Sequence, residues 1–283
     1  MRKISTLVVS VLCMMMLVGA EAQVPTAFVS KGTTDIQAQP HTITQTSSGA
    51  QWAPVDPMVR SITMDNGLPS NAVRSVVQGS KGYMWFGTDN GLCRFDGYDV
   101  KTYYNPFTAI DQYVAALTAC EEGLLVGCNN GAYLFSYETD RFQKLSDKIT
   151  APVLNFSLDG DQNVWISTNG QGVFRYNRTT HELHQYPMKN IQGIVQCTLV
   201  DANNQVWMLS NHSKASIYHL NKSTDQFEAF PLKGDATMFY GMAMLAAPDG
   251  NLYVGTWENG LYKLNADGSA EQLISGTLSN AVH

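Results

Sequence analysis

The sequence WFGTDNGLCRFDG, from Trp85 to Gly97, decides the fold. It begins with a short apolar stretch, passes through the turn-forming residues Asp89, Asn90 and Gly91, and ends in a second stretch in which apolar and polar residues alternate. Asn and Gly readily adopt the positive φ angles that a two-residue hairpin loop needs. The sequence therefore predicts two antiparallel strands joined by a tight turn.

The same pattern recurs along the chain. Its apolar stretches lie at 85–88, 125–128, 165–168, 207–210 and 253–256, at offsets of 40, 40, 42 and 46 residues. A polar turn and a third strand follow each stretch, and another strand with a reverse turn precedes it. Fourth strands close the unit, clearest at 100–104, 142–145 and 227–230.

Four short strands in a period of this length are typical of a β-propeller blade, a small twisted sheet that cannot cover both its faces alone. We expect an all-β propeller of about five four-stranded blades. A helical repeat is not expected because no segment shows a 3.6-residue period, and a leucine-rich repeat would be shorter. The bulky residues Trp85, Trp165, Trp207 and Tyr253 are expected to pack blade against blade. The expected blades span 60–105, 106–146, 147–187, 188–231 and 232–276.

Composition excludes other classes of protein. Of 283 residues, 44% are hydrophobic, 10% aromatic and 15% charged, which is unlike a disordered chain. The net charge is -6 and no basic cluster occurs, so neither a nucleic-acid partner nor a polybasic membrane patch is expected.

The N-terminal residues are expected to lie outside the fold. Arg2 and Lys3 precede an apolar run from Ile4 to Val18, and a small-residue cleavage pattern ends at Ala22. Residues 1–22 therefore read as a cleaved signal peptide, which implies export to the periplasm. Residues 23–57 are rich in Thr, Ser and Gln without apolar periodicity, and we expect a disordered leader before the propeller at 58–283.

Four cysteines remain after cleavage, and their spacing matches no zinc site. Cys120 and Cys128 flank an expected hairpin that turns at 121–123 and pairs Cys120 with Leu124. That register keeps the two sulfurs apart, so buried free thiols are expected.

The first repeat resembles a known family. The stretch GLPSNAV at 67–73, continuing through 85–97, resembles the two-component regulator propeller repeat; the third and fifth repeats match in their core and the second and fourth are degenerate. In that family such blades form the periplasmic sensor region of hybrid two-component histidine kinases, often with two seven-bladed propellers.

The resemblance implies a sensor that binds an oligosaccharide or another small ligand, commonly as a homodimer, and signals through a membrane helix to a kinase. This chain shows neither a second apolar span nor a kinase motif after the signal. We therefore expect no catalytic chemistry, no cofactor and no metal here, with kinase activity and membrane attachment in further C-terminal sequence.

The end of the sequence bears on closure of the ring. Residues 277–283 restate the opening of the first blade, so a sixth blade is expected to begin at 277. Five blades are fewer than rings usually need, and we expect the N-terminal part of a seven-bladed propeller. The side faces of the first and fifth blades should then be exposed to water.

Candidate ligand-binding residues lie in the loops after the repeated apolar stretches. Amide and carboxylate groups beside an aromatic ring suit sugar hydroxyls and the apolar face of a pyranose, although tight turns also favour Asn and Asp. The alternative function is a secreted propeller enzyme acting on a carbohydrate or small ester, but the six His show no metal-ligand spacing. The candidates are Asp89, Asn90, Asn129, Asn130, Asn169, His212, Trp257 and Glu258.

Overall fold

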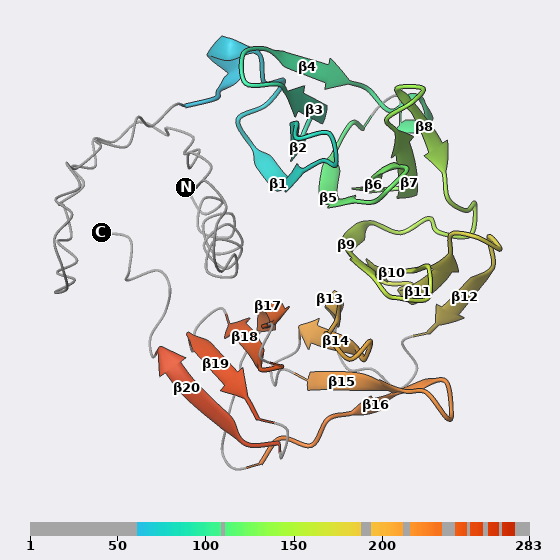
Figure 1. Ribbon diagram of the computed structural model, residues 1–283, viewed down its shortest axis with the longest axis vertical. Helices are drawn as coiled ribbons and strands as arrows, with labels where there is room; N and C mark the ends of the chain where they lie inside the picture. The colour runs from blue at the N-terminus through green and yellow to red at the C-terminus, as the bar shows by residue number, and fades with distance from the viewer. Residues whose placement is uncertain are drawn as a thin grey trace, which may run out of the picture.

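The computed structural model describes most of the expected propeller. It covers residues 61–108, 111–187, 194–211, 216–233, 241–247, 250–256, 260–265 and 268–274. These residues form five four-stranded antiparallel sheets in succession along the chain (Figure 1), which confirms the expected all-β fold of four-stranded blades. The expected signal peptide, the leader and the start of a sixth blade lie outside the described residues.

The blades share one strand order. Blade 1 holds β1 (Val73–Gln78), β2 (Met84–Thr88), β3 (Gly91–Phe95) and β4 (Val100–Tyr103), and blade 2 holds β5 (Val114–Ala119), β6 (Gly123–Cys128), β7 (Gly131–Ser136) and β8 (Arg141–Lys144). Blade 3 holds β9 (Val153–Leu158), β10 (Asn163–Thr168), β11 (Gly172–Asn177) and β12 (Leu183–Tyr186). Blade 4 holds β13 (Ile194–Val200), β14 (Val206–Asn211), β15 (Ser216–Asn221) and β16 (Gln226–Ala229). Blade 5 holds β17 (Gly241–Ala246), β18 (Leu252–Thr256), β19 (Leu261–Leu264) and β20 (Ala270–Ile274).

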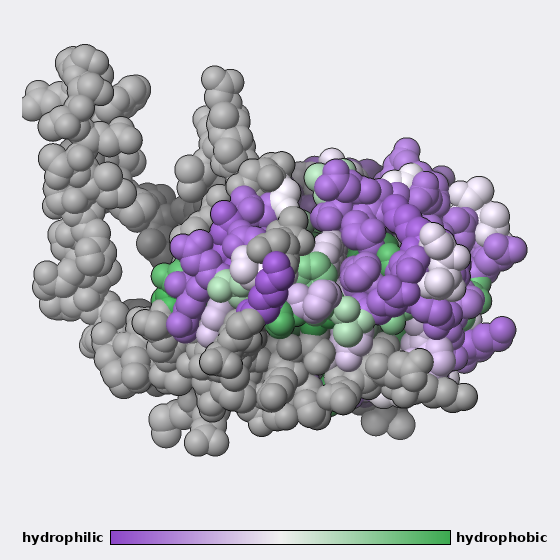
Figure 2. Space-filling view, turned by 90° about the horizontal axis from the view of Figure 1, so that it is seen from below, coloured by the Kyte–Doolittle hydropathy of each residue, from purple (hydrophilic) through white to green (hydrophobic). Residues whose placement is uncertain are grey.

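The first strand of each blade lies toward a common centre and the fourth lies outside (Figure 1). Each inner strand contacts the inner strand of the next blade, from β1 through β17. Blades 1 and 5 stand at the two ends of this series. Seen from below, the described surface is largely hydrophilic with smaller hydrophobic areas between (Figure 2), as expected where the outer strands face water.

Large aromatic side chains join neighbouring blades. Trp85 is 2% exposed, and its ring centroid lies 5.4 Å from that of Phe135 in blade 2. Trp165 packs in the same way against Phe227 of blade 4, at 6.1 Å. Burying side chains of this size contributes about 2–3 kcal/mol each. The expected blade-to-blade role of these two residues is confirmed.

The two end blades differ in how they cover their outward side faces. On blade 1, Ile62 and Leu68 pack against Phe86, Cys93 and Phe95, which are all buried. The expectation that this face is open to water is therefore wrong at these residues, because the segment before β1 lies against it. At the far end Leu273 and Ile274 of β20 are 45% and 55% exposed.

The hairpin between β5 and β6 corrects the expected register. Ala119 pairs with Leu124, and the Cys120 amide donates to the Gly123 carbonyl at 2.9 Å, so the expected pairing of Cys120 with Leu124 is wrong by one residue. A Cβ at Gly123 would lie 2.0 Å from the Phe135 carbonyl oxygen. Only glycine fits there. Gly123 pairs with Ser136 of β7, so it belongs to the ladder rather than to the turn.

The corrected register places Cys120 opposite the first residue of β6, and Cys128 is the last residue of that strand. Both thiols are free and buried, as are those of Cys93 and Cys197. Burial raises the pKa of Cys120 to about 11 and that of Cys128 to about 12, which disfavours the reactive thiolate.

We predict that a chain beginning at Gln23 resists alkylation when folded and takes up four thiol-blocking groups when unfolded. The reason is that burial both shields the sulfurs and raises their pKa. Intact-mass analysis of native and denatured samples checks this. A cross-link between Cys120 and Cys128 would contradict the register.

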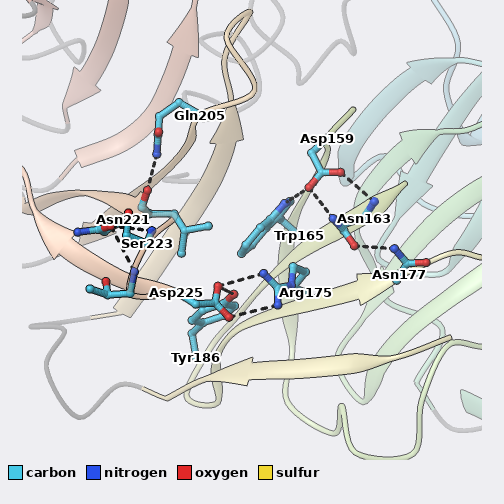
Figure 3. A network of polar contacts seen from close by, with 12 residues as sticks. Asp159, Asn163, Trp165, Arg175, Asn177, Tyr186, Gln205, Asn221, Ser223 and Asp225 are labelled. Carbon is cyan, nitrogen blue, oxygen red and sulfur yellow. Dashed lines mark hydrogen bonds and ion pairs between the residues drawn. The ribbon is translucent and has the colours of Figure 1, made fainter. Parts of the chain in front are cut away.

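An aspartate in the turn before the second strand holds the central tryptophan in two blades. Trp165 Nε1 donates to Asp159 Oδ2 at 2.8 Å (Figure 3), and Trp207 Nε1 donates to Asp201 Oδ2 at 2.9 Å. Asp159 Oδ1 also accepts the Asn163 amide at 2.9 Å, which fixes the turn. One carboxylate thus satisfies a buried ring N–H and shapes a hairpin.

We predict that Asp159→Ala lowers the free energy of unfolding by about 1–3 kcal/mol, because it leaves Trp165 Nε1 buried without an acceptor. Denaturant unfolding of the variant measures the loss. Asp147→Ala is the control, since this carboxylate is 96% exposed and carries the same charge. Equal effects of the two substitutions would contradict the assigned role of Asp159.

Two similar polar clamps tie the third or fourth strand of a blade to the next blade. Arg175 of blade 3 binds Asp225 of blade 4 at 3.0 Å, and Tyr186 donates to the same carboxylate at 2.7 Å (Figure 3). Between blades 1 and 2, Lys101 and Tyr103 bind Asp140 at 3.0 and 3.3 Å. Both aspartates have positive φ, 52° and 54°, which directs each carboxylate from its turn to the preceding blade.

We predict that Asp225→Asn destabilises the protein near neutral pH and that the loss shrinks in acid. Burial alone would raise the pKa of Asp225, but the Tyr186 hydrogen bond and the Arg175 charge outweigh it, so the pKa lies below its ordinary value. Such a carboxyl stabilises the fold above its unfolded pKa, and the contribution disappears as pH falls through the folded pKa.

Unfolding measured between about pH 7 and pH 2 for both proteins checks this. Asn tolerates positive φ, so the substitution preserves the turn. A difference in stability that stays constant down to the lowest pH would contradict the clamp.

Candidate functional site

One end of the blades gathers the loops in which the candidate residues lie. We call it the connection rim: the hairpins β2–β3, β6–β7 and β10–β11 with the segments that lead from one blade to the next. The Asp89 amide donates to the Ala72 carbonyl at 3.1 Å, and the Asn169 amide donates to the Pro152 carbonyl at 2.8 Å. The β2–β3 and β10–β11 hairpins are therefore each bonded to the segment that enters their own blade.

The inner part of this rim, at blades 1 and 2, is organised by Arg74. Arg74 lies at an irregularity of the β1–β2 ladder, between the paired residues Val73 and Ser75. Its Nε and Nη2 donate to the two carboxylate oxygens of Asp89 at 2.6 and 2.9 Å, and its guanidinium lies 5.5 Å from the Tyr113 ring centroid. Bulges of this kind re-aim a side chain, and here one fixes a cation beside an aromatic ring.

A second carboxylate continues the cluster into blade 2. Asn129 Nδ2 donates to Asp111 Oδ2 at 2.6 Å, while Asp111 Oδ1 accepts the Tyr113 amide at 2.9 Å. The segment before β5 is thus fastened to the β6–β7 hairpin. Asp89, Asp111 and Asn129 leave amide and carboxylate groups at a partly exposed edge.

The outer part of the rim carries exposed aromatic rings. Phe107 is 53% exposed and stacks on Tyr133, with centroids 5.8 Å apart and an interplanar angle of 21°. Asn130 holds this pair, because its Nδ2 donates to the Phe107 carbonyl at 3.2 Å and its Oδ1 accepts the Tyr133 hydroxyl at 2.9 Å. Tyr104, on the same connection, is 58% exposed.

We call these residues the blade 1–2 cluster. It combines flat aromatic surface with fixed hydrogen-bond donors and acceptors. The positive charge of its one arginine, Arg74, is already neutralised by Asp89. This chemistry suits a neutral, hydroxyl-rich ligand better than an anion. Its members are Arg74, Asp89, Asn90, Tyr104, Phe107, Asp111, Tyr113, Asn129, Asn130 and Tyr133.

The structure unites some of the expected site residues and not others. Asp89, Asn90, Asn129 and Asn130 lie on the two hairpins of the blade 1–2 cluster, whereas Asn169 lies on the hairpin of blade 3. His212, Trp257 and Glu258 fall outside the described residues.

Sequence reasoning missed six members of the cluster. The available signal for Arg74 was a charged residue within an inner strand, but the ladder irregularity that aims it cannot be read from the sequence. Tyr133 lies on β7, where the core also needs an aromatic residue, and the others lie on the connection between blades 1 and 2, which has no repeat pattern. The six are Arg74, Tyr104, Phe107, Asp111, Tyr113 and Tyr133.

The opposite end of the same two blades holds a hollow of about 530 Å³. The β1–β2 and β5–β6 turns line it with residues such as Gln78, Ser80 and Glu121. It has no aromatic lining, so the connection rim is the better candidate. Within the described ranges, no group of three or more His, Cys, Asp or Glu could hold a metal ion. No helix in the described part is long and apolar enough to cross a membrane.

Comparison with known sequences identifies the first repeat. Residues 67–90 match the family described as two component regulator propeller. The matched segment includes Arg74 and Asp89 of the blade 1–2 cluster. A search of curated proteins finds no match.

Solved structures support the same fold. The extracellular domain of a hybrid two-component system from B. thetaiotaomicron is similar with a TM-score of 0.63 and 18% identity, over 73% of this chain and 28% of that one. Virginiamycin B lyase from Staphylococcus aureus is similar with a TM-score of 0.59 and 14% identity, over 71% and 69% of the two chains. This chain therefore spans little more than a quarter of the first relative's length.

Proposed function

We propose that this chain is the ligand-sensing propeller region of an exported two-component sensor, and that its connection rim binds an oligosaccharide fragment. The observation that carries the proposal is the blade 1–2 cluster, which lies partly within the segment that matches the sensor-propeller family. Exposed Phe107 offers a flat face to a pyranose ring, while Asp111 and Asn129 offer acceptors and donors to its hydroxyl groups.

The proposal extends to the assembly around this chain. The sensor acts in the periplasm after removal of residues 1–22, and a homodimer of the full-length protein carries the signal. Membrane attachment and histidine kinase activity belong to sequence beyond this chain. The similarity to an extracellular domain of a hybrid two-component system supports this placement.

The alternative is a secreted propeller enzyme acting on a carbohydrate or a small ester. The similarity to a lyase over about seven tenths of both chains is the observation that favours it. Incubating the purified chain with the bound glycan, and with ester substrates, separates the two functions: a sensor returns the glycan unchanged, whereas an enzyme releases products.

We predict that Phe107→Ala weakens binding of the responsive glycan by about tenfold or more, because it removes a stacking face worth at least about 1.4 kcal/mol. A thermal-shift screen of an oligosaccharide panel finds the ligand, and calorimetric titration measures its affinity. Asn129→Ala, which removes an amide donor, should also weaken binding.

Tyr98→Ala is the matched control, since Tyr98 is an aromatic residue 85% exposed in the β3–β4 turn at the other end of the blade. Circular dichroism of each variant checks that the fold is intact. Full affinity in Phe107→Ala and Asn129→Ala together would place the ligand elsewhere. Binding to no member of the panel would contradict the sensor proposal for oligosaccharides.

A further inference from the structure

The chain contains five Asn-Gly pairs, and the structure describes four of them in full: Asn66-Gly67, Asn90-Gly91, Asn130-Gly131 and Asn169-Gly170. This dipeptide is prone to deamidation because glycine has no side chain to shield its backbone nitrogen. The four pairs share one chemistry and differ in their surroundings. We propose that Asn169 is the preferred site of spontaneous deamidation in the folded protein.

The reaction needs only water. The Gly170 backbone nitrogen loses its proton and attacks Cγ of the Asn169 side chain, forming a C–N bond, and the side-chain amide leaves as ammonia. Water then opens the resulting succinimide at either carbonyl, which gives aspartate or isoaspartate. The net change replaces an amide by a carboxyl group and adds one negative charge.

A single extra residue in the hairpin loop sets Asn169 apart. In blade 1, Thr88 pairs with Gly91, so the glycine of the Asn-Gly pair is itself a ladder residue. In blade 2, Gly131 occupies the same position opposite Cys128. In blade 3, Thr168 pairs with Gly172, and the loop holds three residues, Asn169, Gly170 and Gln171.

The extra residue moves the Asn-Gly pair from the ladder to the tip of the loop. The hydrogen bond that Thr88 Oγ1 donates to the Gly91 carbonyl at 2.9 Å is made in blade 3 by Thr168 Oγ1 to Gly172, at 2.7 Å. Gly172 thus replaces Gly91 in structure, and Gly170 is left outside the ladder.

The space around Gly170, which lies outside the ladder, differs from the space around the ladder residues Gly91 and Gly131. A Cβ at Gly170 would meet no atom within 4 Å. At Gly131 it would lie 2.5 Å from the Ile149 carbonyl oxygen, and at Gly91 it would lie 3.2 Å from Thr102. The space beside Gly170 is therefore open, whereas Gly91 and Gly131 are enclosed by neighbouring chain.

Side-chain hydrogen bonds restrain two of the competing asparagines. Asn130 is held at both ends of its amide by Phe107 and Tyr133. Asn66 donates to the Ser61 carbonyl at 2.9 Å and accepts the Thr63 amide. Asn169 is exposed, and its side chain makes no hydrogen bond within the described part of the chain. Its amide carbon is therefore less restrained than those of Asn66 and Asn130.

The modification would change the connection rim. Conversion of Asn169 adds a carboxylate beside Gln171, whose Oε1 accepts the backbone amides of Thr150 and Ala151 at 2.9 and 2.8 Å. Isoaspartate also lengthens the backbone at the loop tip. The inference concerns the chemistry of this loop and does not depend on the proposed function.

The test is to incubate the folded chain in mildly alkaline buffer and follow each Asn-Gly peptide by mass spectrometry. Asn169 should convert about tenfold faster than Asn66 and Asn130, because local opening must precede attack at the restrained sites. Asn90, exposed but followed by a ladder glycine, should fall between them. In denatured protein the four rates should converge.

A variant of blade 1 with one glycine inserted after Gly91 gives a second measurement, because the inserted glycine can pair with Thr88 and leave Gly91 inside a three-residue loop, as Gly170 is in blade 3. The rate at Asn90 should then rise toward that of Asn169. Equal rates at Asn169 and Asn130 in the folded chain would overturn the inference whether or not this variant folds. An unchanged rate at Asn90 in the folded variant would show that the place of the glycine in the loop is not the cause.

Discussion

The whole architecture depends on one constraint: a four-stranded blade has two apolar faces and cannot bury both by itself. Each blade must therefore supply a cover for its neighbour. Trp85 and Trp165 meet this need with large rings inserted between blades, and they are almost fully buried as a result. On the face of blade 1 that points away from blade 2, Ile62 and Leu68 supply the cover. The chain before β1 is thus part of the fold's packing.

The blade-to-blade polar contacts follow from the same stacking. Asp140 and Asp225 reach the preceding blade only because each sits at positive φ at the end of its turn. In blade 3 this position holds His181, whose Nδ1 lies 2.7 Å from the Tyr176 hydroxyl of its own blade. The clamp therefore joins blades 1 and 2 and blades 3 and 4. Blades 2 and 3 are joined by a different ion pair, Arg178 with Glu122 at 2.9 Å.

The repeat made the blades predictable, because every blade needs the same alternation and the same turn residues. What differs from one blade to the next was not predictable. The Cys120 register failed by one residue since the contact that requires Gly123 comes from β7. Arg74 was missed because the ladder irregularity that directs it, although present in every blade, cannot be read from the sequence, and Phe107 because its connection has no repeat. Asp89, Asn129 and Asn130 were found because candidate sites and tight turns favour the same residue types.

Differences of one residue in loop length explain how a regular repeat acquires distinct sites. A strand cannot slip by one residue without turning its apolar side chains outward, so the ladders stay fixed and insertions are confined to the rims. The β5–β6 turn, closed by a bond from Cys120 to Gly123, is one residue shorter than the β9–β10 turn, which is closed by a bond from Asp159 to Asn163. At the other rim, the β10–β11 loop is one residue longer than the β2–β3 loop. The rims can therefore change their chemistry from blade to blade while the core keeps its packing. Binding by a small set of blades, as in the blade 1–2 cluster, is the natural result.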